Sequence, residues 1–223
     1  MKKKLIIFGN GEFASIAKYY FNEKKVNYFC IDDHFIKENN FEGIPIIPYS
    51  DLNKIKEKDN YELFVALSYK QMNKIREEKY NQIKKLGFKF SSFIHKNSYI
   101  SNKSIIGENC FILENQTIQR NVIIKNNVFL WSGNHIGHNS IIDNNTYLSS
   151  HVVISGNCQI GKNCFFGVNS SIKEFVNIGN EVLVGMGAII TKNIDSGSVV
   201  INNNNMTIYD KDNKISKVLK NRI

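Results

Sequence analysis

The chain has 223 residues, 42% of them hydrophobic and 22% charged, and this ordinary globular composition allows one large domain or two small ones. No apolar run approaches the ~20 residues that a membrane-spanning helix needs, and the apolar stretch before Gly9 is too brief for the core of a secretory signal. The formal net charge of +9 favours anionic partners. The lysines are scattered without the aromatic and basic stripe typical of nucleic-acid binding, so we expect no nucleic-acid partner.

The cysteines indicate the redox environment. Cys30, Cys110, Cys158 and Cys164 contain no CxxC pair. With no export signal predicted, we expect reduced thiols and a cytoplasmic protein.

Strand and helix signals alternate in the first part of the chain. The sequence predicts strands at residues 4–9, 26–33, 61–69 and 88–95, and helices at residues 12–22 and 70–86. The segment "EGIPIIPYSDL", residues 42–52, holds both prolines and predicts a turn-rich crossing. This order of elements predicts a small parallel sheet in a Rossmann-like domain over residues 1–92.

A glycine motif follows the first strand. "GNGEFA" has the pattern G-x-G-x-x-A, and Asp32 lies about twenty residues further on, as in a dinucleotide-binding fingerprint. In so small a domain the motif is weak evidence for NAD, because the same loop and helix N-terminus bind any phosphate through backbone N–H groups. The alternative is that the glycines serve only the tight turn.

A different pattern begins at Ile94. Every sixth residue from Ile94 to Ile190 is apolar, without a slip, which is the signature of a parallel β-helix built from hexapeptide repeats. Asn recurs three residues after the apolar position, and because Asn tolerates positive φ we expect a corner there. Three repeats close one triangular coil, so residues eighteen apart should stack. The β-helix is expected over residues 93–195, followed by a tail over residues 196–223.

Small or β-branched residues occupy the position four after each apolar residue. This spacing predicts a crowded interior column. Cys110, Cys158 and Cys164 fall in it, so we expect them to pack inside the coil rather than to react.

The stretch "NHIGHNS" holds two histidines outside both apolar columns. His135 and His138 should therefore point outward on either side of the corner at Gly137. Stacking by eighteen places Gly156 next to His138, which would leave an open notch beside the imidazole and an exposed backbone N–H. A base beside an exposed donor suits acyl transfer. The alternative is a plain polar surface residue or a subunit contact, and His151 is expected only to form hydrogen bonds at a corner.

The whole chain resembles bacterial sugar-nucleotide acetyltransferases of the PglD and NeuD type. The resemblance rests on "IIFGNGEFA", "IDD", "NHIGHNS", "SSHVVISGNCQIGKNCFFGVNSSI" and "VGMGAIITKN". It implies an α/β Rossmann-like N-terminal domain followed by a left-handed parallel β-helix, in a homotrimer with active sites between the β-helices. It also implies acetyl-coenzyme A as donor and a nucleotide-linked amino sugar as acceptor.

The resemblance also implies roles for particular residues. His138 aligns with the catalytic histidine, and Gly156 with the glycine whose amide binds the thioester carbonyl. The coenzyme is expected to contact Gly156, Gly167, Val168, Gly185, Gly187 and Ala188. The acceptor is expected to contact Gly9, Asn10, Gly11, Asp32, Asp33 and His135. No resident metal is expected.

The sequence departs from that family at several positions. Asn139 stands where a carboxylate usually follows the histidine, and Asp143 or Glu174 would have to replace it, or the base is weaker. A second family histidine is Tyr147 here, and the usual final G-x-P-A is absent.

Three other functions remain open from the sequence. The same fold could acetylate a sugar hydroxyl. A zinc site of the γ-carbonic anhydrase kind would need His135, His138 and His151 to converge. The chain could also bind a nucleotide sugar without catalysis.

Overall fold

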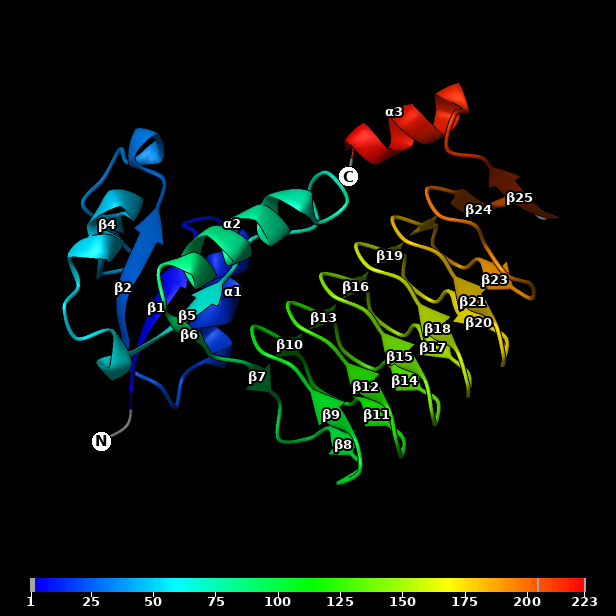
Figure 1. The fold of residues 1–223 in the computed structure, drawn as a ribbon, viewed down its shortest axis with the longest axis horizontal. Helices are drawn as coiled ribbons and strands as arrows, with labels where there is room; N and C mark the ends of the chain where they lie inside the picture. Colours follow the sequence, from blue (N-terminus) through cyan, green and yellow to red (C-terminus); the bar gives the residue numbers. More distant parts are fainter. Residues whose placement is uncertain (1–2, 204, 223) are drawn as a thin grey trace. The chain divides into compact units, whose positions relative to one another are not determined.

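The computed structural model describes residues 3–203 and 205–222 (Figure 1). The chain divides into two compact units, the first built from residues up to Ser68 with Ile75–Phe93, and the second from Tyr69–Lys74 with the residues from Ile94 onward. Among the described residues, no helix combines the length and apolar composition needed to span a membrane.

The first unit is built on a six-stranded sheet. Its strand order is β3-β4-β2-β1-β5-β6, and β1 pairs in parallel with both β2 and β5. Without the edge strand β3, this order matches that of doubly wound nucleotide-binding sheets, in which the order reverses beside the first strand. The strands are β1 (Lys4–Phe8), β2 (Val26–Ile31), β3 (Asn40–Phe41), β4 (Ile44–Pro48), β5 (Tyr61–Val65) and β6 (Lys89–Phe90).

Buried strands and short helices make the core of this unit. Every residue of β1 after Lys4 is buried, as expected for a parallel strand covered on both faces. The helices are α1 (Glu12–Tyr20) and α2 (Lys74–Lys85), with the 3₁₀ segments η1 (Asp33–Phe35), η2 (Tyr49–Lys54) and η3 (Lys58–Asn60).

The proline-containing segment is a strand rather than the predicted turn-rich crossing. β4 pairs in parallel with β2 and antiparallel with the short strand β3. Its prolines are the second and last residues of the strand, whereas Ile46 between them donates its N–H to Asn39 O at 2.9 Å. The missing N–H groups therefore fall near the strand ends, where proline is best tolerated.

The second helix begins later than the sequence predicts. Gln71, Met72 and Asn73 have φ angles of 52°, 54° and 66°, so a right-handed helix cannot start before Lys74. These residues belong to the second unit, where Met72 packs against Leu183 and contributes to a small apolar cluster. The strand predicted at residues 88–95 also divides, because β6 pairs with β5 and the later β7 starts a sheet of the β-helix.

The second unit is a parallel β-helix whose coils follow one another along the chain (Figure 1). One face is β7 (Phe93–Ile94), β10 (Phe111–Ile112), β13 (Phe129–Leu130), β16 (Tyr147–Leu148), β19 (Phe165–Phe166), β22 (Leu183–Val184), β24 (Val199–Asn203) and β25 (Asn205–Tyr209). The second face is β8 (Tyr99–Ile100), β11 (Thr117–Ile118), β14 (His135–Ile136), β17 (Val153–Ile154), β20 (Ser171–Ile172) and β23 (Ile189–Ile190). The third is β9 (Ile105–Ile106), β12 (Ile123–Ile124), β15 (Ile141–Ile142), β18 (Gln159–Ile160) and β21 (Asn177–Ile178).

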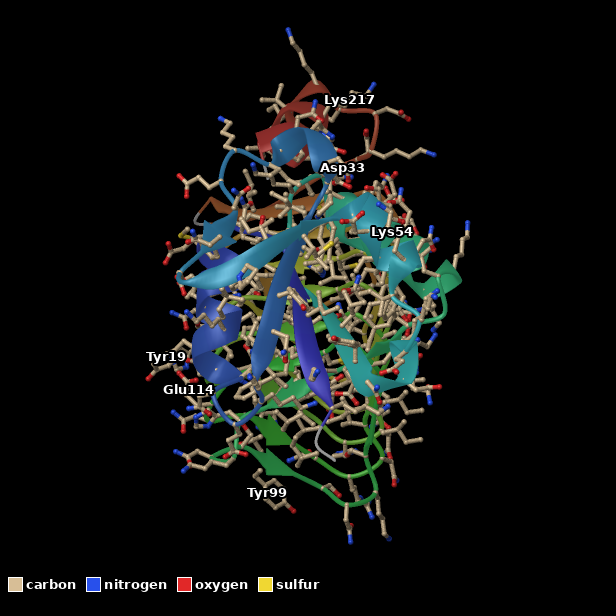
Figure 2. The ribbon with its side chains drawn as sticks, turned by 90° about the vertical axis from the view of Figure 1, so that its left-hand side faces the viewer. Tyr19, Asp33, Lys54, Tyr99, Glu114 and Lys217 are labelled. Carbon is tan, nitrogen blue, oxygen red and sulfur yellow. The ribbon has the colours of Figure 1, made fainter. Side chains whose placement is uncertain are left out.

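Stacking by eighteen residues is confirmed by the strand register. Thr117 pairs with His135, and His135 pairs with Val153, so each step along this face adds eighteen residues. From Ile112 to Ile190 the apolar residue of each repeat is buried, and Ile136 and Ile154 have no exposed surface, whereas Ile94 in the first repeat is 43% exposed. Outward residues are more variable, and Tyr99 of β8 projects from the coil with 66% of its surface exposed (Figure 2).

The predicted corners are confirmed by positive φ angles at six-residue intervals. The corner predicted at Asn97, three residues after Ile94, is an exception, because the φ angle of Asn97 is not positive. Three residues without the tolerance of Asn or Gly share this conformation, namely His151, Phe175 and Glu181, with φ of 58°, 61° and 56°. The asparagines at these corners are Asn109, Asn115, Asn121, Asn127, Asn139, Asn145, Asn157, Asn163 and Asn169, with Gly133 and Gly187 at two others.

The interior column is confirmed as well. Cys110, Cys158 and Cys164 have no exposed surface and belong to the apolar core. Two larger polar residues share the column, and each is accommodated by hydrogen bonds: Gln116 donates to Trp131 O at 2.6 Å, and Asn134 accepts from Val152 N at 2.7 Å.

The last coil is two residues shorter than the others. Ile178 bridges to Ile194 and Leu183 pairs with Val199, sixteen residues on. The β-helix therefore continues past the expected boundary at residue 195, because β24 extends its largest sheet. β25 then pairs antiparallel with β24, and α3 (Lys214–Arg222) ends the described chain.

Replacing the corner residue Phe175 with Asn should stabilise the protein. A bulky side chain at positive φ costs about 1–2 kcal/mol, and Asn relieves most of that cost. Phe175 is 67% exposed, so little packing is lost. We expect a rise of about 1 kcal/mol in the free energy of unfolding, measured with urea. Phe175→Leu places another side chain that disfavours positive φ at this corner, so its free energy of unfolding should not rise. An equal rise in both variants would contradict the backbone strain assigned to Phe175.

Stability should fall as the pH rises above about 9, because the unfolded chain then ionises thiols that folding keeps neutral. Burial raises the pKa of the Cys164 thiol from its ordinary value of 9.0 to about 12. Between these values the unfolded state binds fewer protons than the folded state, so each pH unit lowers the free energy of unfolding. Cys164→Ala removes one such group, and its urea stability should depend less steeply on pH in this window. An unchanged slope would contradict the prediction.

Candidate functional site

His138 lies at an outer corner of the coil, between β14 and β15. The corner forms because Ile136 turns into the core and Asn139 takes a left-handed conformation with φ of 59°. The imidazole is consequently outside the coil and half-buried. We call this corner, and the corners stacked on it, the His138 edge.

The His138 ring lies directly on Gly156 of the next coil. A Cβ added to Gly156 would come within 2.7 Å of His138 Cε1 and 2.8 Å of Nε2. The predicted neighbour is therefore confirmed, but the predicted open notch is wrong, because the imidazole itself occupies the space above the glycine. Any side chain at position 156 would displace the ring.

The backbone N–H of Gly156 has no hydrogen-bond acceptor among the described residues. In contrast, the N–H of His138 donates to Gln119 Oε1 at 2.9 Å. The Gly156 amide is thus an unused donor beside the face of an imidazole. Such a donor stabilises negative charge that develops on a carbonyl oxygen.

Asn139 is the side chain that contacts the His138 ring. Its Nδ2 lies 3.1 Å from His138 Nδ1. Asp143, one of the two acids considered as a replacement for the missing carboxylate, instead pairs with Lys125 Nζ at 2.9 Å. The other, Glu174, is two coils along the column and exposed. The ring is therefore oriented by an amide.

A groove lies along a different edge of the coil. It encloses about 480 Å³ and includes Gly167, Val168 and Gly185, three of the residues expected to contact the coenzyme. These glycines follow strands of the largest sheet, whereas Gly156 lies on the His138 edge. The expected coenzyme contacts are thus divided between two edges of one coil.

An aromatic wall borders this groove, and the sequence reasoning missed it. The rings of Tyr147 and Phe165 stack with centroids 5.5 Å apart, and Tyr69 meets both rings edge-on or tilted. Trp131 and Met186 also line the groove. A signal was present, because large outward residues recur at eighteen-residue spacing at Phe111, Phe129, Tyr147 and Phe165.

Two further residues expected at the coenzyme have other roles. Ala188 is fully buried in the interior column, so its side chain faces the core and cannot contact a ligand in the groove. Gly187 turns a corner with φ of 66°, and its carbonyl accepts a hydrogen bond from Asn202 Nδ2 at 3.1 Å.

The other histidines of the β-helix do not join His138. His135 is half-buried on β14, and the His151 ring packs on Gly133, where an added Cβ would lie 2.5 Å from its Nδ1. Across residues 3–203 and 205–222, no three His, Cys, Asp or Glu side chains group as metal ligands. Within the described part of one chain, His135, His138 and His151 are therefore not grouped as a metal site.

The glycine motif of the first unit forms a tight turn between β1 and α1. Gly9 has φ of 127°, and an added Cβ would lie 2.9 Å from Ala66 O, so only glycine fits. Gly11 precedes α1 without a capping side chain and has open space around its Cα. Asn10 and Gly11 are exposed, so backbone groups at this helix N-terminus face solvent.

The two acids after β2 have different partners. Lys79 Nζ lies 2.5 Å from Asp32 Oδ1 and 4.2 Å from the centre of the Tyr49 ring. Asp33 accepts from the hydroxyl of Ser50 at 2.6 Å, and this bond holds the pKa of the Asp33 carboxyl below its usual value. Asp33 is exposed (Figure 2). Lys79 could not be predicted from the sequence, and its contact with Asp32 joins α2 to the loop that follows β2.

Comparisons with known proteins agree with this architecture. Residues 121–156 match the family model "Bacterial transferase hexapeptide (six repeats)", and residues 158–192 match "Hexapeptide repeat of succinyl-transferase". No curated protein matches the chain. The expected hexapeptide β-helix is thus confirmed, and its repeats and parallel sheets fit a left-handed β-helix.

Solved structures share the fold over nearly the whole chain. The acetyltransferase domain of PglB from Neisseria gonorrhoeae, in complex with acetyl coenzyme A, is 22% identical, with a TM-score of 0.81 over 94% of this chain and 100% of that chain. PerB from Caulobacter crescentus, in complex with CoA and GDP-perosamine, is 19% identical, with a TM-score of 0.82 over 94% of this chain and 98% of that one. WeeI from Acinetobacter baumannii is 19% identical, with a TM-score of 0.58 over 93% of this chain and 100% of that chain.

Proposed function

We propose that the protein transfers the acetyl group of acetyl-coenzyme A to the amino group of a nucleotide-linked amino sugar, for bacterial surface glycan biosynthesis. The observation that carries this function is the His138 imidazole packed on Gly156, whose N–H has no acceptor among the described residues. The structures of similar fold support the choice of ligands, because they contain acetyl coenzyme A, or CoA with GDP-perosamine.

The chemistry is a direct transfer. The sugar nitrogen attacks the thioester carbonyl carbon, a C–N bond forms, and the carbonyl oxygen becomes an oxyanion that accepts the Gly156 N–H. His138 Nε2 removes a proton from the nitrogen and passes it to sulfur as the C–S bond breaks, which releases coenzyme A as the thiol. All four cysteines are buried, so no thiol nucleophile is assigned.

The proposed coenzyme site is the groove beside Tyr147. Gly167, Val168 and Gly185 line it, and Gly187 lies at the corner two residues after Gly185. Because this groove and the His138 edge are on different edges of one coil, one complete site needs the edge of one protomer beside the groove of another. This requirement supports a homotrimer with active sites between neighbouring β-helices.

The nucleotide of the acceptor is assigned to the glycine turn of the first unit. Backbone N–H groups of Asn10 and Gly11 at the start of α1 suit its phosphates. Asp32 and Asp33 are placed to receive hydroxyl or base donors, and Gly9 keeps the loop tight. His135 on β14 is assigned to the acceptor sugar. The net charge of +9 favours two polyphosphate ligands, and we place the reaction in the cytoplasm, where the donor is made.

Mass spectrometry tests this function. The full-length protein is incubated with acetyl-coenzyme A and with UDP-, dTDP- or GDP-linked amino sugars, each beside its hydroxyl counterpart. We expect one amino sugar to gain a single acetyl group while its hydroxyl counterpart stays unchanged. Acetylation of the hydroxyl sugar alone would identify an O-acetyltransferase, and no acetylation of either class would reject the proposal.

A further inference from the structure

We propose that a ladder of three asparagine amides determines which nitrogen of the His138 ring carries the proton. The ladder consists of Asn121, Asn139 and Asn157, stacked at eighteen-residue spacing along the His138 edge. The inference deepens the proposed function, because it concerns the group assigned there as the base. Asn139 is accordingly a positioning residue.

The ladder has a direction. Asn121 Nδ2 donates to Asn139 Oδ1 at 3.0 Å, and Asn139 Nδ2 donates to Asn157 Oδ1 at 3.1 Å. The same Nδ2 lies 3.1 Å from His138 Nδ1. An amide nitrogen has two hydrogens and no lone pair to accept with, so it can supply both contacts only as a donor.

This direction fixes the ring tautomer. Because Asn139 donates to Nδ1, that nitrogen holds a lone pair, and the proton of the neutral ring is on Nε2. A Cβ added to Gly156 would lie 2.8 Å from Nε2 and 3.2 Å from Nδ1, so Nε2 is the ring nitrogen nearer to the glycine Cβ position. With the ladder in this direction, Nε2 is therefore itself a donor and cannot accept a proton.

Reversing the ladder produces the opposite tautomer. If Asn157 donates to Asn139 and Asn139 donates to Asn121, the carbonyl Oδ1 of Asn139 faces His138. Nδ1 then carries the proton and donates it to that oxygen, which frees the lone pair of Nε2. A carboxylate at position 139 would accept in either case, whereas an amide makes the base conditional on the direction of the ladder.

The surroundings favour a change of amide direction over a rotation of the ring. Gly156 lies against the flat face of the imidazole, and Gln119 Oε1 accepts the backbone N–H of His138. Asn121 and Asn139 are exposed and Asn157 is half-buried, so their amides have room to turn. All three have φ near 60°, which holds their backbones alike.

Two variants with the same change test the ladder from opposite ends. In Asn157→Asp the new carboxylate can only accept, so it keeps the Asn139 Nδ2 toward position 157 and Nε2 protonated. In Asn121→Asp the carboxylate draws that Nδ2 toward position 121 and frees Nε2. Both variants add one negative charge, one coil from Asn139. An effect of charge alone would move both variants in the same direction.

The direct measurement is nitrogen-15 NMR of histidine-labelled full-length protein at about pH 9, well above the pKa of a free imidazole. His138 is assigned from the signal lost in His138→Ala. We expect an Nε2 proton in the Asn157→Asp variant and an Nδ1 proton in the Asn121→Asp variant. The same tautomer in both variants would overturn the inference.

Kinetics supply the second readout. The kcat for acetyl transfer should be higher in Asn121→Asp than in Asn157→Asp, on the order of tenfold, since one hydrogen bond separates the two ring states. Equal kcat values with different tautomers would show that His138 is not the base, so the proposed mechanism would fail while the ladder stands. Different kcat values with one shared tautomer would overturn the ladder.

Discussion

His138→Ala should lower kcat for acetyl transfer by about 10²–10⁴-fold, which is the usual contribution of a positioned general base. The sugar amine would lose the group that takes its proton as the C–N bond forms. The KM for acetyl-coenzyme A should change little, because the groove that is assigned to the coenzyme is on another edge of the coil. Steady-state assays of thiol release, with the acetylated sugar verified by mass spectrometry, measure both constants.

His151→Ala is the matched control for this loss. The His151 imidazole also packs on a glycine of a neighbouring coil, Gly133, and also occupies an outer corner. It has no unused backbone donor assigned to it, so we expect a kcat close to that of the wild type. Equal losses of kcat in the two variants would show that activity depends on an imidazole packed against a glycine rather than on a base at position 138. The assignment of His138 as the base would then be wrong.

Gly156→Ala should remove activity without unfolding the protein. Its Cβ would lie 2.7 Å from His138 Cε1, closer than non-bonded carbons approach, so the ring must leave its place. The change also disturbs the N–H assigned to the oxyanion, and loss of one such donor costs about 10²–10³-fold in kcat. Forced overpacking usually costs about 1–3 kcal/mol of stability, measured by urea unfolding.

A double-mutant cycle identifies the source of the stability loss. In a His138→Ala background the ring is absent, so adding Gly156→Ala should cost almost no further stability. The difference between the two backgrounds measures the collision between residues 138 and 156. An equal cost in both backgrounds would mean that the methyl group meets the backbone instead of the imidazole.

The β-helix could be predicted from sequence because each of its constraints selects a residue type locally. An interior position accepts only apolar or small side chains, as at Ile136 and Cys158, and a corner with positive φ selects Asn or Gly. Since the coil repeats every eighteen residues, these local rules also placed Gly156 against His138. The pairing was correct, but no periodic rule describes how a ring fills the space above a glycine.

Contacts between segments distant in sequence could not be predicted in the same way. The start of α2 is set by three residues with left-handed backbones, and Asn73 among them donates to Cys164 O at 3.0 Å. The contact between Lys79 and Asp32 likewise joins α2 to the loop after β2, and the sequence pattern does not show how these two segments pack. The aromatic wall includes Tyr69, which lies outside the repeats altogether.

The shortened last coil and its antiparallel hairpin also bear on assembly. A stack of equivalent layers has no inherent length, and its final layer exposes backbone groups to which another chain could add. Here β25 runs against the direction of the strand that precedes it and covers the rim of the largest sheet. On that side the outermost strand is antiparallel to the coil, so a further parallel layer would not continue the same pairing. The hairpin thus ends the parallel stacking of this sheet, and it should disfavour addition of another parallel layer at this end.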